Sequence, residues 1–172
     1  TSPVIPCDFV AVAGDIFERL KELEPGGAGL ELDRALLKAE RLKVAAKALS
    51  DRSAQINAQC EAGTGTAEAH ASIANEALKK LSRLLLPLCG TVKGAYGHDP
   101  YAYTPQTTML PALYDVPAYG RLPEGEPRWL LQTKLLREAN RVRDTLDEAV
   151  AVIDRALSEL GYRVDVADNG ID

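Results

Sequence analysis

The chain has 172 residues, 46% of them hydrophobic and 26% charged, and its formal net charge is -5. This length fits one domain with a substantial core, and the composition is that of a globular protein rather than a disordered or fibrous one. Basic residues are interleaved with acidic ones, which argues against a nucleic-acid surface. The aliphatic run at residues 84–88 is too short to span a bilayer, so no membrane segment is expected.

Two amphipathic helices are predicted in the first part of the chain. Asp8 is a good N-cap, and apolar residues follow at three- and four-residue steps over residues 9–20, until the Pro-Gly-Gly sequence at residues 25–27 stops the pattern. A longer pattern covers residues 32–56 and fades at the glycines of residues 63–65. Each pattern predicts a helix with one apolar stripe.

The third predicted helix has Thr66 as its cap and an apolar stripe over residues 73–85, and we expect Pro87 and Gly90 to end it. Between residues 90 and 127 the sequence becomes rich in Tyr, Pro, Thr and Gly, which predicts a long ordered crossover loop. Its tyrosines either anchor the loop on the helices or form a surface that contacts a partner protein. A third hypothesis is that they line a small-molecule pocket. They are Tyr96, Tyr101, Tyr103, Tyr114 and Tyr119.

The last predicted helix has the clearest pattern in the sequence. Apolar residues recur at steps of three or four over residues 131–157, charged residues occupy the opposite face, and Gly161 ends the pattern. Residues 162–166 alternate weakly and are the one doubtful strand. The predicted fold is therefore all-α, a four-helix-bundle-like domain over residues 1–172 with one long Tyr/Pro-rich crossover loop.

No complete catalytic or metal site is evident in the sequence. His70 and His98 belong to no zinc or di-iron spacing, and no serine or cysteine has the surroundings of an activated nucleophile. Cys7, Cys60 and Cys89 are odd in number and far apart, so we expect buried free thiols. The chain begins at Thr1 rather than Met, which we interpret as a fragment or a processed chain.

Four segments, in order, resemble the C-terminal helical domain of glutamate-carboxypeptidase-like zinc exopeptidases, the transferrin-receptor-like dimerisation domain. They are residues 4–13 (VIPCDFVAVA), 75–87 (NEALKKLSRLLLP), 110–115 (LPALYD) and 136–142 (LREANRV). The third departs from the family pattern, because Ala112 stands where the family has glycine. The resemblance spans nearly the whole chain.

The resemblance implies a non-catalytic domain that pairs two copies of a zinc-dependent carboxypeptidase or aminopeptidase. The partners would be a second copy and an upstream peptidase domain, which would hold the zinc, since the family's zinc ligands have no matching positions here. Tyr101 and Tyr103 are the candidates for lending a side chain to the peptidase's substrate pocket. The interface candidates are Tyr114, Tyr119, Trp129, Leu135 and Val142. The alternative is a free-standing helical bundle that binds a protein or a ligand.

Overall fold

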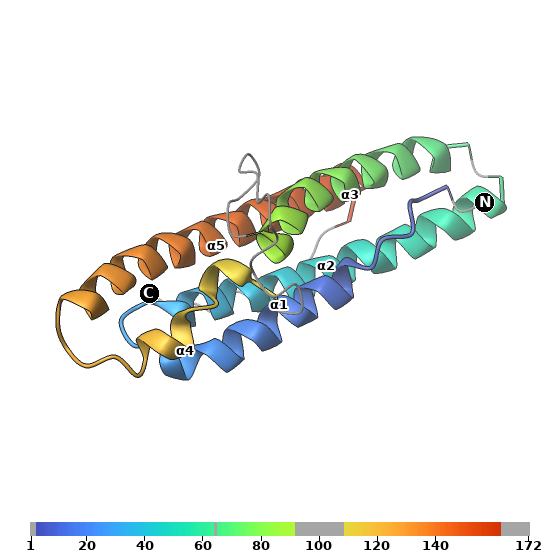
Figure 1. Ribbon diagram of the computed structural model, residues 1–172. Coiled ribbons are helices and arrows are strands. Elements are labelled where there is room, and N and C mark those ends of the chain that lie inside the picture. Colours follow the sequence, from blue (N-terminus) through green and yellow to red (C-terminus); the bar gives the residue numbers. More distant parts are fainter. Residues whose placement is uncertain (1–2, 64, 92–108, 163–172) are drawn as a thin grey trace, which may run out of the picture.

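The computed structural model describes residues 3–63, 65–91 and 109–162 (Figure 1). The expected all-α fold is confirmed: the described residues form helices and no strand. The four long helices are α1 (Phe9–Leu23), α2 (Leu32–Glu61), α3 (Ala67–Gly90) and α5 (Glu126–Glu159). Between them lie the short helix α4 (Val116–Tyr119) and two 3₁₀ turns, η1 (Glu24–Gly26) and η2 (Pro111–Leu113).

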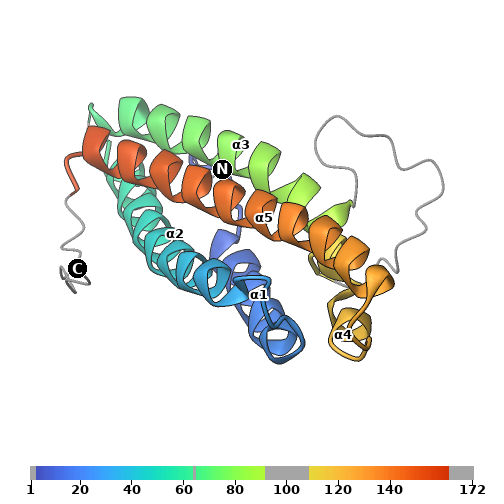
Figure 2. The same ribbon diagram turned by 90° about the vertical axis from the view of Figure 1, so that its left-hand side faces the viewer.

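The four long helices form a bundle-like arrangement in which α2, α3 and α5 pack on one another and α1 packs on α2. α5 has 34 residues and is about 51 Å long at 1.5 Å per residue. It runs antiparallel to α3, and the two helices lie side by side on the face of the bundle away from α1 (Figures 1 and 2). One core of Leu, Ile, Val and Ala side chains joins all four.

The helix ends follow the sequence signals in part. The Asp8 cap is confirmed, because its Oδ1 accepts a hydrogen bond of 2.9 Å from the Ala11 N–H. The Thr66 cap is wrong, because Thr66 has helical backbone angles and its side chain makes no capping hydrogen bond. Pro87 does not end α3, which continues to Gly90, and the carbonyl of Pro87 accepts the Thr91 N–H at 3.2 Å. Pro87 lacks the N–H that would bond to the carbonyl of residue 83, so it removes one hydrogen bond of α3, but it does not prevent the residues after it from continuing the helix.

The second part of the predicted crossover loop, residues 109–125, is not a plain loop but contains η2 and α4. Pro111 and Pro117 lie in the first turns of these elements, where the missing N–H is not needed. Leu110 is fully buried and takes a left-handed φ of 55° immediately before η2. The sharp turn of this segment is thus made at Leu110, and Ala112 is not among the residues with positive φ.

Tyr119 anchors this segment in the core. Its side chain is 1% exposed and its hydroxyl donates a 2.9 Å hydrogen bond to the carbonyl of Ala28, in the α1–α2 connection. The Arg128 guanidinium lies 4.5 Å from the ring centroid and donates to the carbonyls of Tyr119 and Leu122. A cation over an aromatic face adds attraction to the buried area. The segment is therefore joined to both the α1–α2 hairpin and α5.

Candidate functional site

The structure divides the predicted interface residues into two groups. Tyr119 is 1% exposed, and Leu135 and Val142 are 0% exposed, so these three fill the core of a single chain. Their side chains are thus covered by their own chain. Helical periodicity finds an apolar stripe but does not say whether the same chain or another one covers it. Tyr114 and Trp129 remain exposed, at 51% and 59%. Tyr101 and Tyr103 lie outside the described residues.

Tyr114 follows η2, and Trp129 lies with Leu130 near the start of α5; these three exposed apolar residues are here called the Trp129 surface. Leu130 is 67% exposed. Lys134 lies one turn beyond Leu130 and forms a 2.8 Å ion pair with Asp115, the neighbour of Tyr114. This ion pair holds the turn after η2 against α5. The three apolar side chains are thus carried by segments that are fixed to each other.

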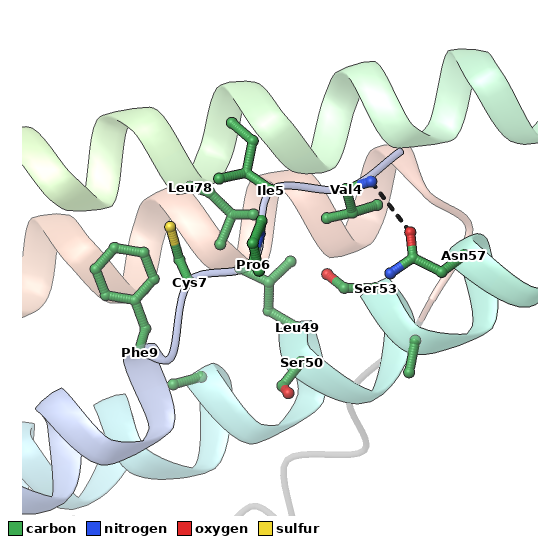
Figure 3. Close-up of a pocket in the computed structure, with 12 residues that line it drawn as sticks. Val4, Ile5, Pro6, Cys7, Phe9, Leu49, Ser50, Ser53, Asn57 and Leu78 are labelled. Carbon is green, nitrogen blue, oxygen red and sulfur yellow. Dashed lines mark hydrogen bonds between the residues drawn. The ribbon is translucent and has the colours of Figure 1, made fainter. Parts of the chain in front are cut away.

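A second feature is the strap, residues 3–8, which precedes α1 and runs between α2 and α3 (Figure 3). Asn57 Oδ1 on α2 accepts the Val4 N–H at 3.0 Å, and Asn75 Oδ1 on α3 accepts the Ile5 N–H at 2.8 Å. Asn75 Nδ2 also donates to the Pro3 carbonyl at 2.9 Å. The two asparagine amides therefore bind the strap backbone much as a neighbouring strand would.

A cavity of about 240 Å³ lies beside the strap. Figure 3 shows Ser53 and Asn57 of α2 facing the strap, with Leu78 of α3 on the other side. The Ser53 Oγ is buried and has no hydrogen-bond partner among the described residues. Apolar walls with few polar atoms are typical of small-molecule pockets, although this volume is below their usual range of about 300–1,000 Å³.

A third feature is a groove between α3 and α5, of about 490 Å³. Its floor consists of small or half-buried apolar side chains, and exposed charges form its two rims. The floor residues are Ile73, Ala77, Val152 and Ala156. The charged residues are Glu76 and Lys80 on α3, and Glu148, Arg155 and Glu159 on α5. Alanines in the floor leave room for another helix to approach closely, so the groove has the form of a docking surface rather than of a catalytic pocket.

Most of the rim charges form no ion pair with the residues that the structure describes. Lys79 Nζ donates a 2.9 Å hydrogen bond to Glu76, which lowers the pKa of that carboxyl and keeps it ionised at neutral pH. In the part of the chain that the structure describes, no ion pair involves Lys80, Glu148 or Arg155. These three charges are available to a partner.

The candidate reactive residues do not come together. His70 lies in α3 and its Nδ1 is buried without a described partner, whereas His98 lies outside the described residues. Cys7 is exposed, so the expectation of a buried thiol is wrong there, because the strap that carries it is a surface segment. Cys60 and Cys89 are partly buried, and burial raises the pKa of the Cys89 thiol to about 11.

Metal-binding clusters and membrane-spanning helices are both absent from the described ranges. Within residues 3–63, 65–91 and 109–162, no group of three or more His, Cys, Asp and Glu side chains is placed to hold a metal ion. No helix in these same ranges is both long enough and apolar enough to cross a membrane.

Sequence reasoning missed the groove and the strap contacts. The groove had a signal, since Val152 and Ala156 are four residues apart on α5, beside the main stripe, and predict a second apolar edge. Asn57 and Asn75 carry no such signal, because an asparagine within a helix does not indicate which distant backbone it binds.

Comparisons of this chain with protein-family models, curated proteins and solved structures found no match.

Proposed function

We propose that this chain is the helical association domain of a glutamate-carboxypeptidase-like zinc exopeptidase. In this proposal the chain pairs with a second copy of itself and rests on an upstream peptidase domain, which holds the zinc and performs the catalysis. The order of the four resembling segments supports the proposal. In the structure, those segments are the strap with the start of α1, the second half of α3, the turn at η2, and the middle of α5.

One observation carries the association role: after the core is complete, apolar side chains remain exposed or half-buried, and two of the places where they do so are described above. The Trp129 surface has three side chains that are more than half exposed, and the groove between α3 and α5 has an apolar floor. Trp and Tyr are enriched in interfaces, and contiguous exposed apolar surface marks interaction sites. Two surfaces suit two partners, a second copy and a peptidase domain.

Light scattering or sedimentation equilibrium of the purified 172-residue chain tests the self-association. We expect dimers at micromolar concentration. A strict monomer at high micromolar concentration would contradict this part of the proposal.

The proposed link to a peptidase domain is tested by reading the coding sequence upstream of Thr1. We expect several hundred codons upstream of Thr1 whose product is rich in His, Asp and Glu.

In that full-length protein, Trp129→Ser should weaken the contact between the two domains and lower the temperature at which they unfold together. Leu86→Ser is the matched control, because Leu86 is 69% exposed and lies on α3.

The cavity beside the strap favours a second candidate, a free-standing bundle that binds a small ligand. The buried Ser53 Oγ and the apolar walls would suit a compact apolar molecule with one hydrogen-bonding group. Titration with phenol, followed by NMR shifts of the Ser53 and Asn57 amides, tests it. Saturable shifts that Ser53→Ala abolishes would support the ligand-binding reading, and unchanged spectra would count against it.

A further inference from the structure

We infer that the groove between α3 and α5 is the surface by which two copies of this chain pair, about a two-fold axis that runs along the groove. The inference rests on the self-association proposed above and names its site. It commits to a second copy as the occupant because of the order of the charges on the two rims.

The order of the rim charges follows from the antiparallel course of the two helices (Figure 2). Lys80 lies towards the C-terminal side of the groove on α3, and Glu148 lies on the side of the groove nearer the start of α5, so both are at the same end. Glu76 on α3 and Arg155 on α5 follow towards the other end. These two positions along the length of the groove are here called levels. At each level, the α3 rim and the α5 rim of one chain carry opposite charges.

A two-fold axis along the groove places α3 of one copy over α5 of the other and keeps the order of levels along the axis. Lys80 of each copy then faces Glu148 of the other, and Glu76 of each faces Arg155 of the other. All four contacts join opposite charges, and the symmetry generates each type twice. An axis across the groove would instead place α3 over α3 and α5 over α5, with Lys80 facing Glu76 and Glu148 facing Arg155 of the other copy. These pairs are also attractive, so the exchange of charges between two variants is what distinguishes the two axes.

The floor of the groove fits the same arrangement. Ala77 and Ala156 are small and almost fully covered, whereas Ile73 and Val152 are half-buried and still offer apolar area. Small side chains allow a close approach of helices, and partly exposed aliphatic ones gain by being covered. Pairing therefore assembles α3 and α5 of both copies into a four-helix bundle with an apolar centre and charged edges.

The test uses two variants of the 172-residue chain, Lys80→Glu and Glu148→Lys, each studied alone and then mixed. In each variant alone, both symmetry-related contacts become repulsive, and we expect the dimer to weaken at least about tenfold.

Mixing the two variants should restore the dimer. In a heterodimer, the glutamate introduced in one variant faces the lysine introduced in the other, and the second contact keeps the native pair of Lys80 with Glu148. Both contacts are then attractive again. The mixture should therefore form heterodimers, which native mass spectrometry identifies by their mass when one variant is labelled with the heavy nitrogen isotope.

A second set, Glu76→Lys with Arg155→Glu, tests the other level in the same way. The matched controls are Glu40→Lys and Arg41→Glu, which make the same charge changes at exposed positions of α2. They should leave dimerisation unchanged. Helical circular dichroism of every variant shows that the bundle is still folded, as expected for exposed helix positions.

The outcomes separate this inference from the proposal on which it rests. A wild-type chain that never dimerises overturns both. A wild-type dimer whose dissociation constant is the same in all four groove variants overturns the inference alone and leaves self-association through another face. Variants that are monomeric alone and stay monomeric when mixed also overturn it, because the two-fold arrangement requires the exchange of charges to restore the contact.

Discussion

The segment of residues 109–125 and the strap both lie outside the four long helices, and they differ in how much of the core they complete. The segment of residues 109–125 buries Leu110, Leu113, Val116 and Tyr119, each at most 1% exposed. The strap of residues 3–8 buries one side chain, Val4, and leaves Ile5 38% exposed. Both segments are joined to helices by hydrogen bonds of ordinary length. The difference between them lies in apolar burial, which contributes more to stability than exposed polar contacts do.

This contrast predicts different kinds of unfolding. Removing a contact from the 109–125 segment should lower the global stability of the bundle, because its side chains are part of the one core. Removing a contact from the strap should mainly release the strap, since local opening costs less free energy than global unfolding. Three substitutions test this difference.

The largest effect is expected for Tyr119→Ala. Removing a fully buried aromatic ring typically costs about 3–5 kcal/mol, and here the substitution also removes the hydroxyl that binds the Ala28 carbonyl. Chemical denaturation monitored by circular dichroism measures the loss. Tyr119→Phe is the control, and it should cost about 1 kcal/mol because it removes only the hydrogen bond. A Tyr119→Ala cost no larger than that of Tyr119→Phe would show that the segment is not part of the core.

A smaller effect is expected for Gly120→Ala. A Cβ added at Gly120 would lie 2.9 Å from the carbonyl oxygen of Gly26, in the backbone of η1. The backbone of one segment or the other must shift, at a cost of about 1–3 kcal/mol. Gly14→Ala is the matched control, because a Cβ there meets nothing within 4 Å and Gly14 lies within α1. It should stabilise the chain by about 0.5–1 kcal/mol, as alanine is the better helix former. Equal effects of the two substitutions would mean that α4 does not contact η1.

The sequence predicted the parts of the fold that depend on local spacing. The helices α1 and α5 begin and end within a few residues of the predicted positions, because each has a regular apolar stripe and a clear terminating glycine or Pro-Gly sequence. The prediction for Pro87 is wrong because a proline removes one backbone hydrogen bond to the preceding turn but does not prevent the following residues from continuing the helix. The core role of Leu135 and Val142, and the binding of the strap by Asn75, depend on contacts between distant residues, which local spacing does not specify.

The smallest effect on stability is expected for Asn75→Ala, which removes both hydrogen bonds of that amide to the strap. The bond to Ile5 is exposed and the bond to Pro3 is only partly buried, so the global free energy of unfolding should fall by only about 1 kcal/mol. Hydrogen exchange of the Ile5 amide should accelerate much more than that of amides within α5, because the strap opens without the bundle. Asn75→Asp keeps the acceptor for Ile5 and loses the donor to Pro3, so it should fall between the wild type and Asn75→Ala.

The opposite exchange pattern would break the comparison between the two segments. If Asn75→Ala accelerated the exchange of α5 as much as that of Ile5, the strap would open only together with the core. The strap would then belong to the same cooperative unit as the 109–125 segment, despite burying only Val4.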